Sequence, residues 1–306
     1  MKKVSVVIPC YNSERFLEAT VNKIKNVLKH HDFEIVLVND SSKDNTLEVI
    51  RKLVERNDSI IGIDLAHNTG QHNATMAGFH YVSGDYVLTA ADDGQTPLEK
   101  WDEMLDALEN GYDVSTVNFM DRGRRSLFRR MGSRLSKAMI DLLIDNLEHG
   151  WVAFEFAAKR FVIDEMIRYQ GPYASMNGLI LRVTHNIKTI PCSQHERVTG
   201  KSGYTFRKLF KLFINQSTSF SIKPLRLAGI CGVIVTILGI VLGLTVIINR
   251  IIGGTFLYGS GLNIVLIISA GLIMQMLGLI GEYVGRIYMV LNNTPQYVVR
   301  DEIRKL

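Results

Sequence analysis

The segment Thr89–Pro97, TAADDGQTP, holds the densest group of side chains in this sequence that could do chemistry. Two adjacent carboxylates, Asp92 and Asp93, follow an apolar run, and the amide of Gln95 comes shortly after them. Aspartate and amide oxygens are hard ligands that suit Mg²⁺ or Mn²⁺, and these ions often hold the phosphates of a substrate as well. An isolated pair of aspartates is more often a helix cap or a solvated turn, so the interpretation depends on what surrounds it.

Two more polar clusters follow apolar runs, at 10–12 and 39–44. The first 120 residues alternate β-branched apolar runs with stretches of helical spacing, which is typical of βαβ units and of a parallel sheet covered on both faces. Strands are expected at 4–9, 33–39, 60–65, 86–90 and 114–119, and helices at 14–28, 44–56, 71–82 and 99–108. The sequence therefore predicts an α/β, Rossmann-like domain with a parallel sheet. All three polar clusters should converge beyond the carboxyl ends of its strands, where such sheets bind ligands.

The composition narrows the range of partners. The 306 residues are 47 % hydrophobic and carry a formal net charge of +5, which favours an anionic partner such as phosphate groups, nucleic acid or a membrane surface. The three cysteines are scattered without a CxxC or Cys/His cluster, so neither a disulfide framework nor a structural zinc site is indicated. No GxGxxG follows any expected strand, and the P-loop pattern GxxxxGK(S/T) is absent.

The last third of the sequence predicts a membrane anchor. No charged residue occurs at 227–248 or at 256–281, and roughly 20 apolar residues suffice to cross a bilayer core. Two transmembrane helices are therefore expected as a hairpin, at about 227–248 and 260–281. Basic residues flank both outer ends of the pair, which places the N-terminal domain in the cytoplasm by the positive-inside rule.

Two basic stretches with an apolar stripe, at 121–145 and 195–213, suit amphipathic helices that lie at a membrane interface. A solvated basic face is the plainer interpretation of either stretch alone, but the apolar segments that follow favour the interface. The expected order is a cytoplasmic domain at 1–204, a juxtamembrane amphipathic segment at 205–225, two membrane helices within 226–291 and a cytoplasmic tail at 292–306.

Seven short motifs run in order along nearly the whole chain: VVIPCYN (6–12), LVNDSSKDNT (37–46), HNTGQHNATMAG (67–78), GDYVLTAADDGQTP (84–97), FRRMGSRL (128–135), RVTGKSGYT (197–205) and GEYVGRIY (281–288). In this combination the sequence resembles the inverting nucleotide-sugar glycosyltransferases with the A-type fold. Within them, it is similar to the membrane-anchored polyprenyl-phosphate glycosyltransferases, the relatives of dolichol-phosphate mannose synthase.

The resemblance implies inverting transfer of a sugar from a nucleotide sugar, expected to be a UDP-sugar, to undecaprenyl or another polyprenyl phosphate. The reaction would take place at the cytoplasmic face of the inner (plasma) membrane and give a lipid-linked monosaccharide for modification of cell-envelope glycans. The resemblance also implies a divalent cation, Mg²⁺ or Mn²⁺, and a multi-pass membrane protein. A homo-oligomer, by resemblance a tetramer, is expected, and no nucleic-acid partner.

The resemblance also assigns site residues. The nucleotide would be bound by Pro9, Tyr11, Asn12, Asp40, Gln71 and Asp92. The divalent cation would be bound by Asp93 and Gln95. The acceptor phosphate would be held by Arg125, Arg130, Ser133, Arg197 and Lys201. The residues expected to be catalytic are Asp92, Asp93 and Arg130. Since a polyprenyl phosphate is already an anionic nucleophile, the arginines need only position it.

The chain departs from the family pattern at Ala91, where relatives usually carry Asp, and at Ala153, where many carry an acidic residue before a Phe. Either Asp92 makes the missing nucleotide contact or the chain is an inactivated variant. Two alternative functions remain. A processive polysaccharide synthase would share the fold, but such enzymes carry a QxxRW sequence that is absent around Trp101 and Trp151. A catalytically inactive membrane adaptor that binds nucleotide sugar or lipid has Ala91 as its only support.

Overall fold

The computed structural model describes residues 2–119, 152–171, 174–192, 223–252 and 260–305. Within these residues the strands are β1 (Val4–Cys10), β2 (Phe33–Asn39), β3 (Ile60–Leu65), β4 (Tyr86–Thr89), β5 (Val114–Phe119), β6 (Phe156–Lys159), β7 (Ile187–Cys192) and β8 (Val299–Ile303). The α-helices are α1 (Leu17–Val27), α2 (Thr46–Arg56), α3 (Gln71–Phe79), α4 (Trp101–Glu109), α6 (Arg160–Met166), α7 (Met176–Val183), α9 (Lys223–Ile251) and α10 (Ser260–Leu291). A short 3₁₀ helix, η1 (Leu98–Lys100), precedes α4.

The strands form one sheet in the order β7-β5-β6-β4-β1-β2-β3-β8. β1 pairs in parallel with both β2 and β4, so that Val4 lies opposite Phe33 on one side and Tyr86 on the other. The chain thus builds the sheet from β1 in one direction through β2 and β3, and then crosses to the other side of β1 with β4. The carboxyl ends of β1 and β4 meet at this switch point, where open α/β sheets bind their ligands.

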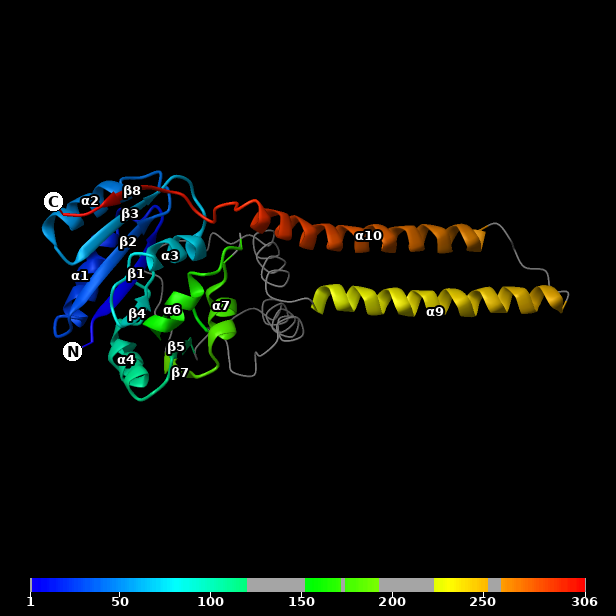
Figure 1. The fold of residues 1–306 in the computed structure, drawn as a ribbon, viewed down its shortest axis with the longest axis horizontal. Coiled ribbons are helices and arrows are strands. Elements are labelled where there is room, and N and C mark those ends of the chain that lie inside the picture. Colours follow the sequence, from blue (N-terminus) through cyan, green and yellow to red (C-terminus); the bar gives the residue numbers. More distant parts are fainter. Residues whose placement is uncertain (1, 120–151, 172–173, 193–222, 253–259, 306) are drawn as a thin grey trace.

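β1 and β2 are apolar on both faces because helices cover both faces of the sheet. In β1, Val6 and Ile8 belong to a core shared with α1, α2 and α4, whereas Val7, which points the other way, belongs to a core shared with α3, α6 and α7. α3 lies so close to the sheet that a Cβ on Gly78 would come 2.5 Å from Cγ1 of Val7. Glycine at this position therefore lets α3, and the loop before it, lie directly against the strands (Figure 1).

The expected strands of the first 120 residues are all present, with bounds within about one residue of the prediction. The sheet differs from the prediction in being mixed, because β6 is antiparallel to β4 and β5, and β8 is antiparallel to β3. β6 is only four residues long and β8 is rich in charge. Neither strand has the continuous apolar run that reveals a buried parallel strand in a sequence.

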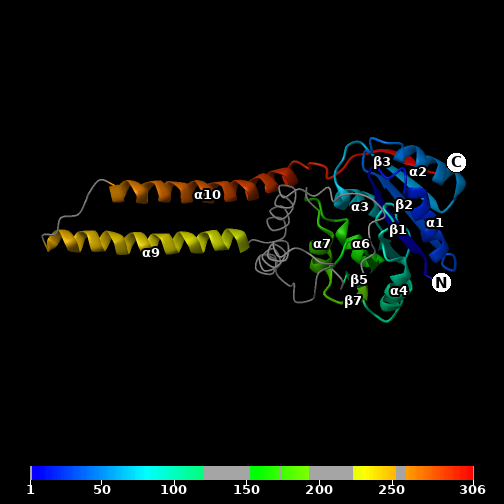
Figure 2. The same ribbon diagram turned by 180° about the vertical axis from the view of Figure 1, so that it is seen from behind.

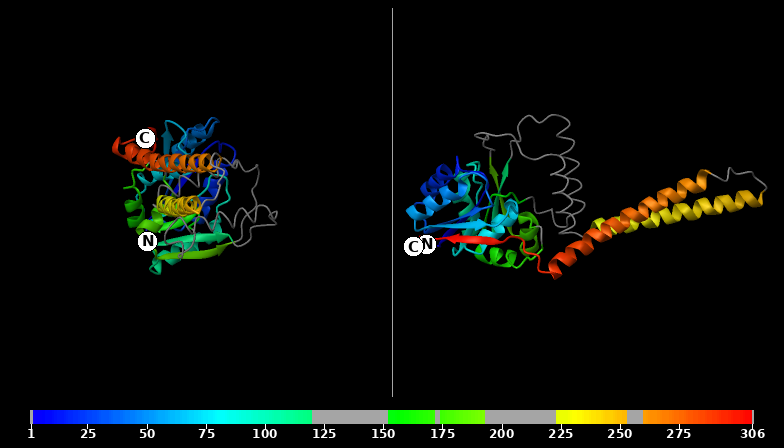
Figure 3. Two further views of the ribbon diagram at one scale, coloured as in Figure 1. Left: turned by 90° about the vertical axis from the view of Figure 1, so that its right-hand side faces the viewer. Right: turned by 90° about the horizontal axis from the view of Figure 1, so that it is seen from above.

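α9 and α10 lie side by side and project together from one end of the sheet domain, as the views in Figure 1, Figure 2 and Figure 3 agree. Large apolar side chains are exposed along both helices, and Met274 of α10 is 73 % exposed. Among the residues described, the stretch Ile268–Leu291 is long and apolar enough to cross a membrane, with a mean hydropathy of 1.3, whereas the apolar stretch Gly232–Val241 of α9 is shorter. One candidate span is thus present, placed later in α10 than expected, and the second span stays a prediction.

After α10 the chain returns to the domain and adds β8 to the edge of the sheet beside β3 (Figure 1). Arg300 of β8 forms an ion pair with the buried carboxylate of Asp64 at 3.3 Å. The side-chain amide of Gln296 donates a hydrogen bond to the backbone oxygen of Tyr169 at 2.6 Å. Residues 299–303, within the segment 292–306 expected as a cytoplasmic tail, therefore complete the sheet, and no pattern in the sequence predicts this strand.

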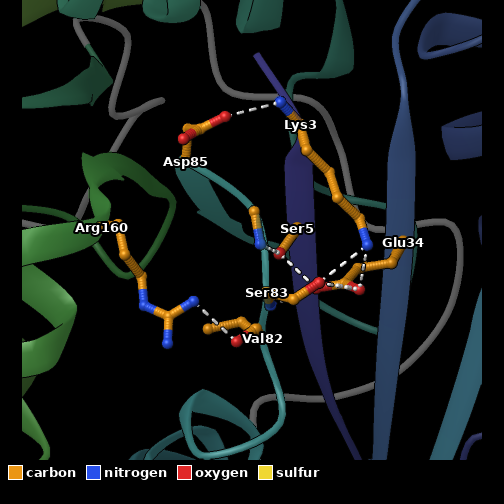
Figure 4. A network of polar contacts seen from close by, with 8 residues as sticks. Lys3, Ser5, Glu34, Val82, Ser83, Asp85 and Arg160 are labelled. Carbon is orange, nitrogen blue, oxygen red and sulfur yellow. Dashed lines mark hydrogen bonds and ion pairs between the residues drawn. The ribbon is translucent and has the colours of Figure 1, made fainter.

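A polar network ties the amino ends of β1, β2 and β4 together, at the edge opposite the switch point (Figure 4). Glu34 of β2 is 7 % exposed and accepts hydrogen bonds from the hydroxyls of Ser5 at 2.6 Å and Ser83 at 2.7 Å, and Lys3 forms an ion pair with it at 2.8 Å. Burial alone would raise the pKa of Glu34, but these donors outweigh it and hold the pKa below its ordinary value of 4.5. The charged form is therefore the one that stabilises the fold.

We expect Glu34→Gln to lower the free energy of unfolding by about 1–3 kcal/mol at neutral pH, because an amide keeps the shape of the side chain but loses the charge and one acceptor. Since the pKa of Glu34 is lower in the folded chain than in the unfolded chain, the difference should shrink as the pH falls below 4.5. Chemical unfolding of the full chain in detergent at neutral and acid pH measures it. Glu18→Gln is the control, because among the described residues this exposed side chain is paired with the exposed Arg56 at 3.5 Å. Equal effects of the two substitutions at neutral pH would contradict this role of Glu34.

Candidate active site

The loops that follow β1 and β2 hold each other at the carboxyl edge of the sheet. The backbone N–H of Asn12 donates to Oγ of Ser42 at 3.1 Å, and the N–H of Lys43 donates to Oδ1 of Asn12 at 2.8 Å. Asn12 and Ser41 both have a left-handed backbone, with φ of 53° and 54°. Residues other than glycine pay roughly 1–3 kcal/mol for such a conformation, so the mutual contacts keep two strained turns at the edge where a ligand would bind.

Asp40 fixes the loop between β3 and α3 against the end of β2. The residue is 3 % exposed, and its Oδ1 accepts hydrogen bonds from the N–H of Thr69 at 2.7 Å and from the hydroxyl of Thr69 at 3.1 Å. Its Oδ2 accepts from the N–H of Gly70 at 2.9 Å, and the side chain of Asn68 donates to its backbone oxygen at 3.1 Å. A contact between Asp40 and the nucleotide stays a prediction beside this structural role.

Asp92 joins the turn after β4 to the loop after β1, across the switch point. Its Oδ2 accepts the N–H of Tyr11 at 3.1 Å, and its backbone oxygen accepts the hydroxyl of Thr20 at 3.1 Å. Burial raises the pKa of Asp92, and the Tyr11 N–H opposes that rise only in part. The buried hydroxyl of Ser13 lies beside this carboxylate and also opposes the rise of its pKa. Tyr11 is 45 % exposed, so an aromatic side chain is available to a ligand next to Asp92.

The turn after β4 sets a carboxylate and an amide side by side. The N–H of Gln95 donates to Oδ1 of Asp93 at 3.1 Å, and the N–H of Ala91 donates to Oγ1 of Thr96 at 2.8 Å. Gly94 between them has a φ of 72°, which closes the turn. Asp93 and Gln95 are partly exposed, and no hydrogen bond from a described residue reaches Oδ2 of Asp93. A divalent cation takes one or two carboxylates from a protein and further oxygens from phosphates, so this donor set fits the expected cation.

Glu155 is an acidic residue at the same edge that is absent from the predicted set. It directly precedes β6, and the antiparallel pairing of Leu88 with Ala157 continues to place it opposite Ala90, close to the turn. Burial raises the pKa of Glu155, and the nearby negative charge of Asp93 raises it further. The signal that could have identified this residue is one carboxylate inside the apolar run VAFEFAA (152–158).

His72, in the first turn of α3, is held neutral near this edge. Burial lowers the pKa of His72 from 6.5 to about 4. Its ring meets Phe154 edge-on, with the ring centroids 6.1 Å apart, and its Nδ1 has no hydrogen-bond partner among the described residues. At neutral pH this imidazole therefore carries no positive charge.

The structure gathers several predicted residues at the carboxyl edge of the sheet: Tyr11, Asn12, Asp40, Asp92, Asp93 and Gln95. Pro9 is buried within β1, and Gln71 is exposed at the start of α3. The predicted acceptor residues lie outside the described part of the chain: Arg125, Arg130, Ser133, Arg197 and Lys201. The donor side of the site can thus be examined, and the acceptor side stays a prediction.

The mixed sheet with a carboxylate–amide turn at its switch point defines the class of A-type glycosyltransferases. The fold is similar to that of glucosyl-3-phosphoglycerate synthase from Mycobacterium tuberculosis in complex with Mn²⁺ and UDP-glucose, with a TM-score of 0.52 and 14 % identity over 71 % of this chain and 77 % of that chain. Mannosyl-3-phosphoglycerate synthase from Rubrobacter xylanophilus is similar with a TM-score of 0.50 and 15 % identity, over 70 % and 71 % of the two chains. At these identities the likeness concerns the fold alone.

Residues 5–169 match glycosyl transferase family 2. The chain is 32 % identical over 308 residues to the undecaprenyl-phosphate 4-deoxy-4-formamido-L-arabinose transferase of Photorhabdus laumondii subsp. laumondii, which covers 98 % of this chain and 94 % of that protein. It is 33 % identical over 306 residues to the enzyme of the same name from Yersinia pestis, with coverage of 98 % and 93 %. The chain belongs to glycosyl transferase family 2, and the resemblance seen in its motifs is confirmed.

We expect Asp40→Asn to loosen the loop 66–70, because the new amide nitrogen would face the N–H of Gly70 and leave two donors opposed. A loss of about 1–3 kcal/mol should speed exchange of the amide hydrogens of Thr69 and Gly70 by roughly 5- to 150-fold. Hydrogen exchange of the full chain, followed by mass spectrometry, measures this. Asp58→Asn, at an exposed residue paired with Lys305, is the control. Unchanged exchange at 66–70 in Asp40→Asn would show that Asp40 does not hold the loop.

Proposed function

We propose that this chain transfers a sugar, with inversion, from a nucleotide sugar to undecaprenyl phosphate or another polyprenyl phosphate. The observation that carries the proposal is the likeness to undecaprenyl-phosphate sugar transferases over 98 % of the chain, the apolar helices included. A UDP-sugar is the donor we favour, since the fold is similar to that of an enzyme in complex with UDP-glucose and Mn²⁺. The sugar of the named relatives, 4-deoxy-4-formamido-L-arabinose, is the first one to test.

On the acceptor side, the proposed reaction needs the protein mainly to position the phosphate. A phosphate oxygen of the lipid attacks the anomeric carbon, the bond from that carbon to the diphosphate breaks, and its electron pair leaves with the nucleoside diphosphate. Because the attacking oxygen is already ionised, no general base is needed, and a site can act mainly by holding the two reactants in line. Basic residues suit the positioning of the acceptor phosphate, and Arg130, with Ser133 beside it, is our main candidate for that role.

The residues proposed to bind the sugar donor and its cation lie in the described part of the chain. A bound divalent cation would offset the negative charge that develops on the leaving diphosphate. Asp93 and Gln95 would hold that cation, because they present a carboxylate and an amide from one closed turn. Tyr11 and Asn12 would border the nucleotide, while Asp92 and Asp40 keep the surrounding loops in register. Gln71, exposed at the start of α3, would contact the nucleotide from the opposite side of the switch point.

We further propose that α9 and α10 both cross the membrane and that the sheet domain lies on its cytoplasmic side. The exposed apolar side chains of both helices support this placement. The basic residues that flank the pair support the same orientation. A homo-oligomer is also proposed, on the resemblance alone. The enzyme would then be a multi-pass protein of the inner membrane whose active site opens toward the lipid phosphates.

A glycolipid assay with the purified full chain tests the function. Undecaprenyl phosphate is mixed with Mn²⁺ and each of several nucleotide sugars, including the UDP derivative of 4-deoxy-4-formamido-L-arabinose, and the lipid product is identified by mass spectrometry. We expect one sugar attached through a phosphodiester. A polymer of sugars would favour a polysaccharide synthase, and binding of the donor without any product would favour an adaptor.

We expect Asp93→Asn to lower the rate of transfer by about 10²-fold, or about 2.7 kcal/mol, because it removes a charged ligand of the cation that offsets the leaving group. The Mn²⁺-dependent part of UDP binding should weaken as well, as measured by calorimetry with and without a chelator. Asp102→Asn, at an exposed position on α4, is the matched control. Should Asp93→Asn bind UDP with the same dependence on Mn²⁺ as the unaltered chain, the cation assignment is wrong.

A further inference from the structure

β8 carries a bulge at the point where it meets the end of β3. In the antiparallel pairing of the two strands, Asp64 lies opposite Asp301 and Leu65 lies opposite Val299, so the register skips Arg300. An extra residue of this kind redirects a side chain from the regular alternation of a strand, and bulges recur next to active sites for that reason. The bulge therefore accounts for the place of Arg300 beside the carboxyl end of β3.

The guanidinium of Arg300 contacts β3 and the loop that follows it. Its Nη1 lies 3.3 Å from Oδ2 of Asp64, and its Nη2 donates to the backbone oxygen of Ala66 at 2.8 Å. The N–H of Ala66 donates in turn to the backbone oxygen of Val298 at 2.8 Å. Ala66 begins the loop before α3, which Asp40 holds from the other side. This loop of the candidate site is therefore fixed between the end of β2 and the start of β8.

Asp64 connects the same contact to the turn after β2. Its carboxylate is buried, and Oδ1 accepts a hydrogen bond from the side-chain amide of the buried Asn39 at 2.7 Å. The amide oxygen of Asn39 accepts the N–H of Ser42 at 3.2 Å, and Oγ of Ser42 accepts the N–H of Asn12 at 3.1 Å. A carboxylate only accepts and an N–H only donates, so these partners allow one orientation of the Asn39 amide. The contacts therefore run without a gap from Arg300 to the loop after β1.

The positive charge of Arg300 compensates for the buried charge of Asp64. Removal of one partner of such a pair leaves an uncompensated charge where little water reaches, which is strongly unfavourable. The carboxylate of Asp64 would then shift toward water, and Asn39, which donates to it, would lose its fixed orientation. Asn12 and Ser41, in the linked turns, have a left-handed backbone that persists only while the surrounding contacts hold it. A change at Arg300 should therefore reach the turns at the carboxyl edge.

We propose that Arg300 is a positioning residue of the donor site, which acts through Asp64 and Ala66 on the loops that border the nucleotide. The proposal rests on the function proposed above, because it takes the nucleotide to bind at this edge. α10 ends at Leu291, and Arg300 belongs to the segment that leads back from α10 to the sheet. The donor site is therefore complete only when the chain beyond the two long apolar helices has joined the sheet.

The first test is UDP binding by the full chain in detergent, measured by calorimetry with Mn²⁺. We expect Arg300→Met to weaken UDP binding by about 3- to 30-fold, because methionine loses the charge and both donors. Arg304→Met is the matched control, since the side chain of Arg304 is 61 % exposed against 58 % for Arg300 and pairs with the nearby Glu302. Equal UDP affinity of the two variants would overturn the proposal.

Hydrogen exchange without ligand separates this role from a merely structural one. In Arg300→Met, we expect the amide hydrogens of Asn12 and Ser42 to exchange about 3- to 30-fold faster, because the contacts that hold them depend on Asp64. The amide of Gly84, which donates a hydrogen bond at the opposite edge of the sheet, should keep its rate. Equal acceleration at Gly84, or along the whole of β8, would mean that the substitution only loosens the fold, and the proposal fails.

A double variant tests whether Arg300 acts through Asp64. In Asp64→Asn, the carbonyl oxygen of the new amide can still accept the hydrogen bond from Asn39, but the charge opposite Arg300 is lost. Asp64→Asn should weaken UDP binding, and Arg300→Met should weaken it less in this background than in the unaltered chain. An unchanged UDP affinity of Asp64→Asn, or two effects that multiply in full, contradicts the proposed route.

Glycolipid formation is scored separately from binding. Where the unaltered chain forms glycolipid, Arg300→Met should raise the KM for the nucleotide sugar and leave the KM for undecaprenyl phosphate unchanged. A rise in the KM for the lipid alone would overturn the proposal. If the unaltered chain binds UDP but forms no glycolipid, the proposed function is rejected and the binding results for Arg300 stand. If it does not bind UDP, the donor assignment is rejected, and hydrogen exchange still decides whether Arg300 holds the loops.

Discussion

The parallel pairing of β1 with β2 on one side and β4 on the other is the constraint on which the rest of the site depends. It brings the loops after β1, β2 and β4, distant in sequence, to one edge, where their polar groups and those of the loop after β3 hydrogen-bond to each other. Asn12 exchanges hydrogen bonds with the loop after β2, Asp40 holds the loop after β3, and Asp92 holds the loop after β1. The loops are therefore one interlocked unit, and a change of register in any of these strands would displace all of them.

The carboxylates at the two ends of the sheet differ in their partners and in the direction of their pKa shifts. At the amino ends, Glu34 receives a lysine and two hydroxyls, and its pKa is lowered. At the carboxyl ends, Asp92 and Glu155 are partly exposed, and burial raises the pKa of both, although the N–H of Tyr11 donates to Asp92. At the amino ends, where no ligand is proposed, the buried charge of Glu34 is thus compensated within the protein. Among the described residues, no positive charge compensates for the carboxylates of Asp92 and Glu155 where a cation and a diphosphate are proposed to bind, a pattern typical of functional sites.

The elements that could be predicted from the sequence are those marked by a local pattern of residue types. Continuous apolar runs identified β1 to β5 closely, and residue types identified the turn of Asp93 and Gln95. β6, with four residues, and the charged β8 carry no such pattern, and their place in the sheet depends on partners far away in the sequence. Glu155 could not be assigned to this edge for the same reason, because the pairing of β6 with β4 brings it there. The acceptor residues Arg125, Arg130, Ser133, Arg197 and Lys201 rest on motif resemblance and lie outside the described residues.

The return of the chain to form β8 has a consequence for the order of biosynthesis. Residues 299–303 leave the ribosome after α9 and α10, so translation of both long apolar helices comes before the sheet can close along β3. Until then β3 presents an unpaired strand edge, the kind of surface that invites pairing with another chain. Arg300 of the charged strand that finally covers it, and Gln296 just before that strand, also tie α10 back to the domain. A nascent chain that stalls before its last few residues would therefore carry both long apolar helices and still expose the edge of an unfinished catalytic sheet.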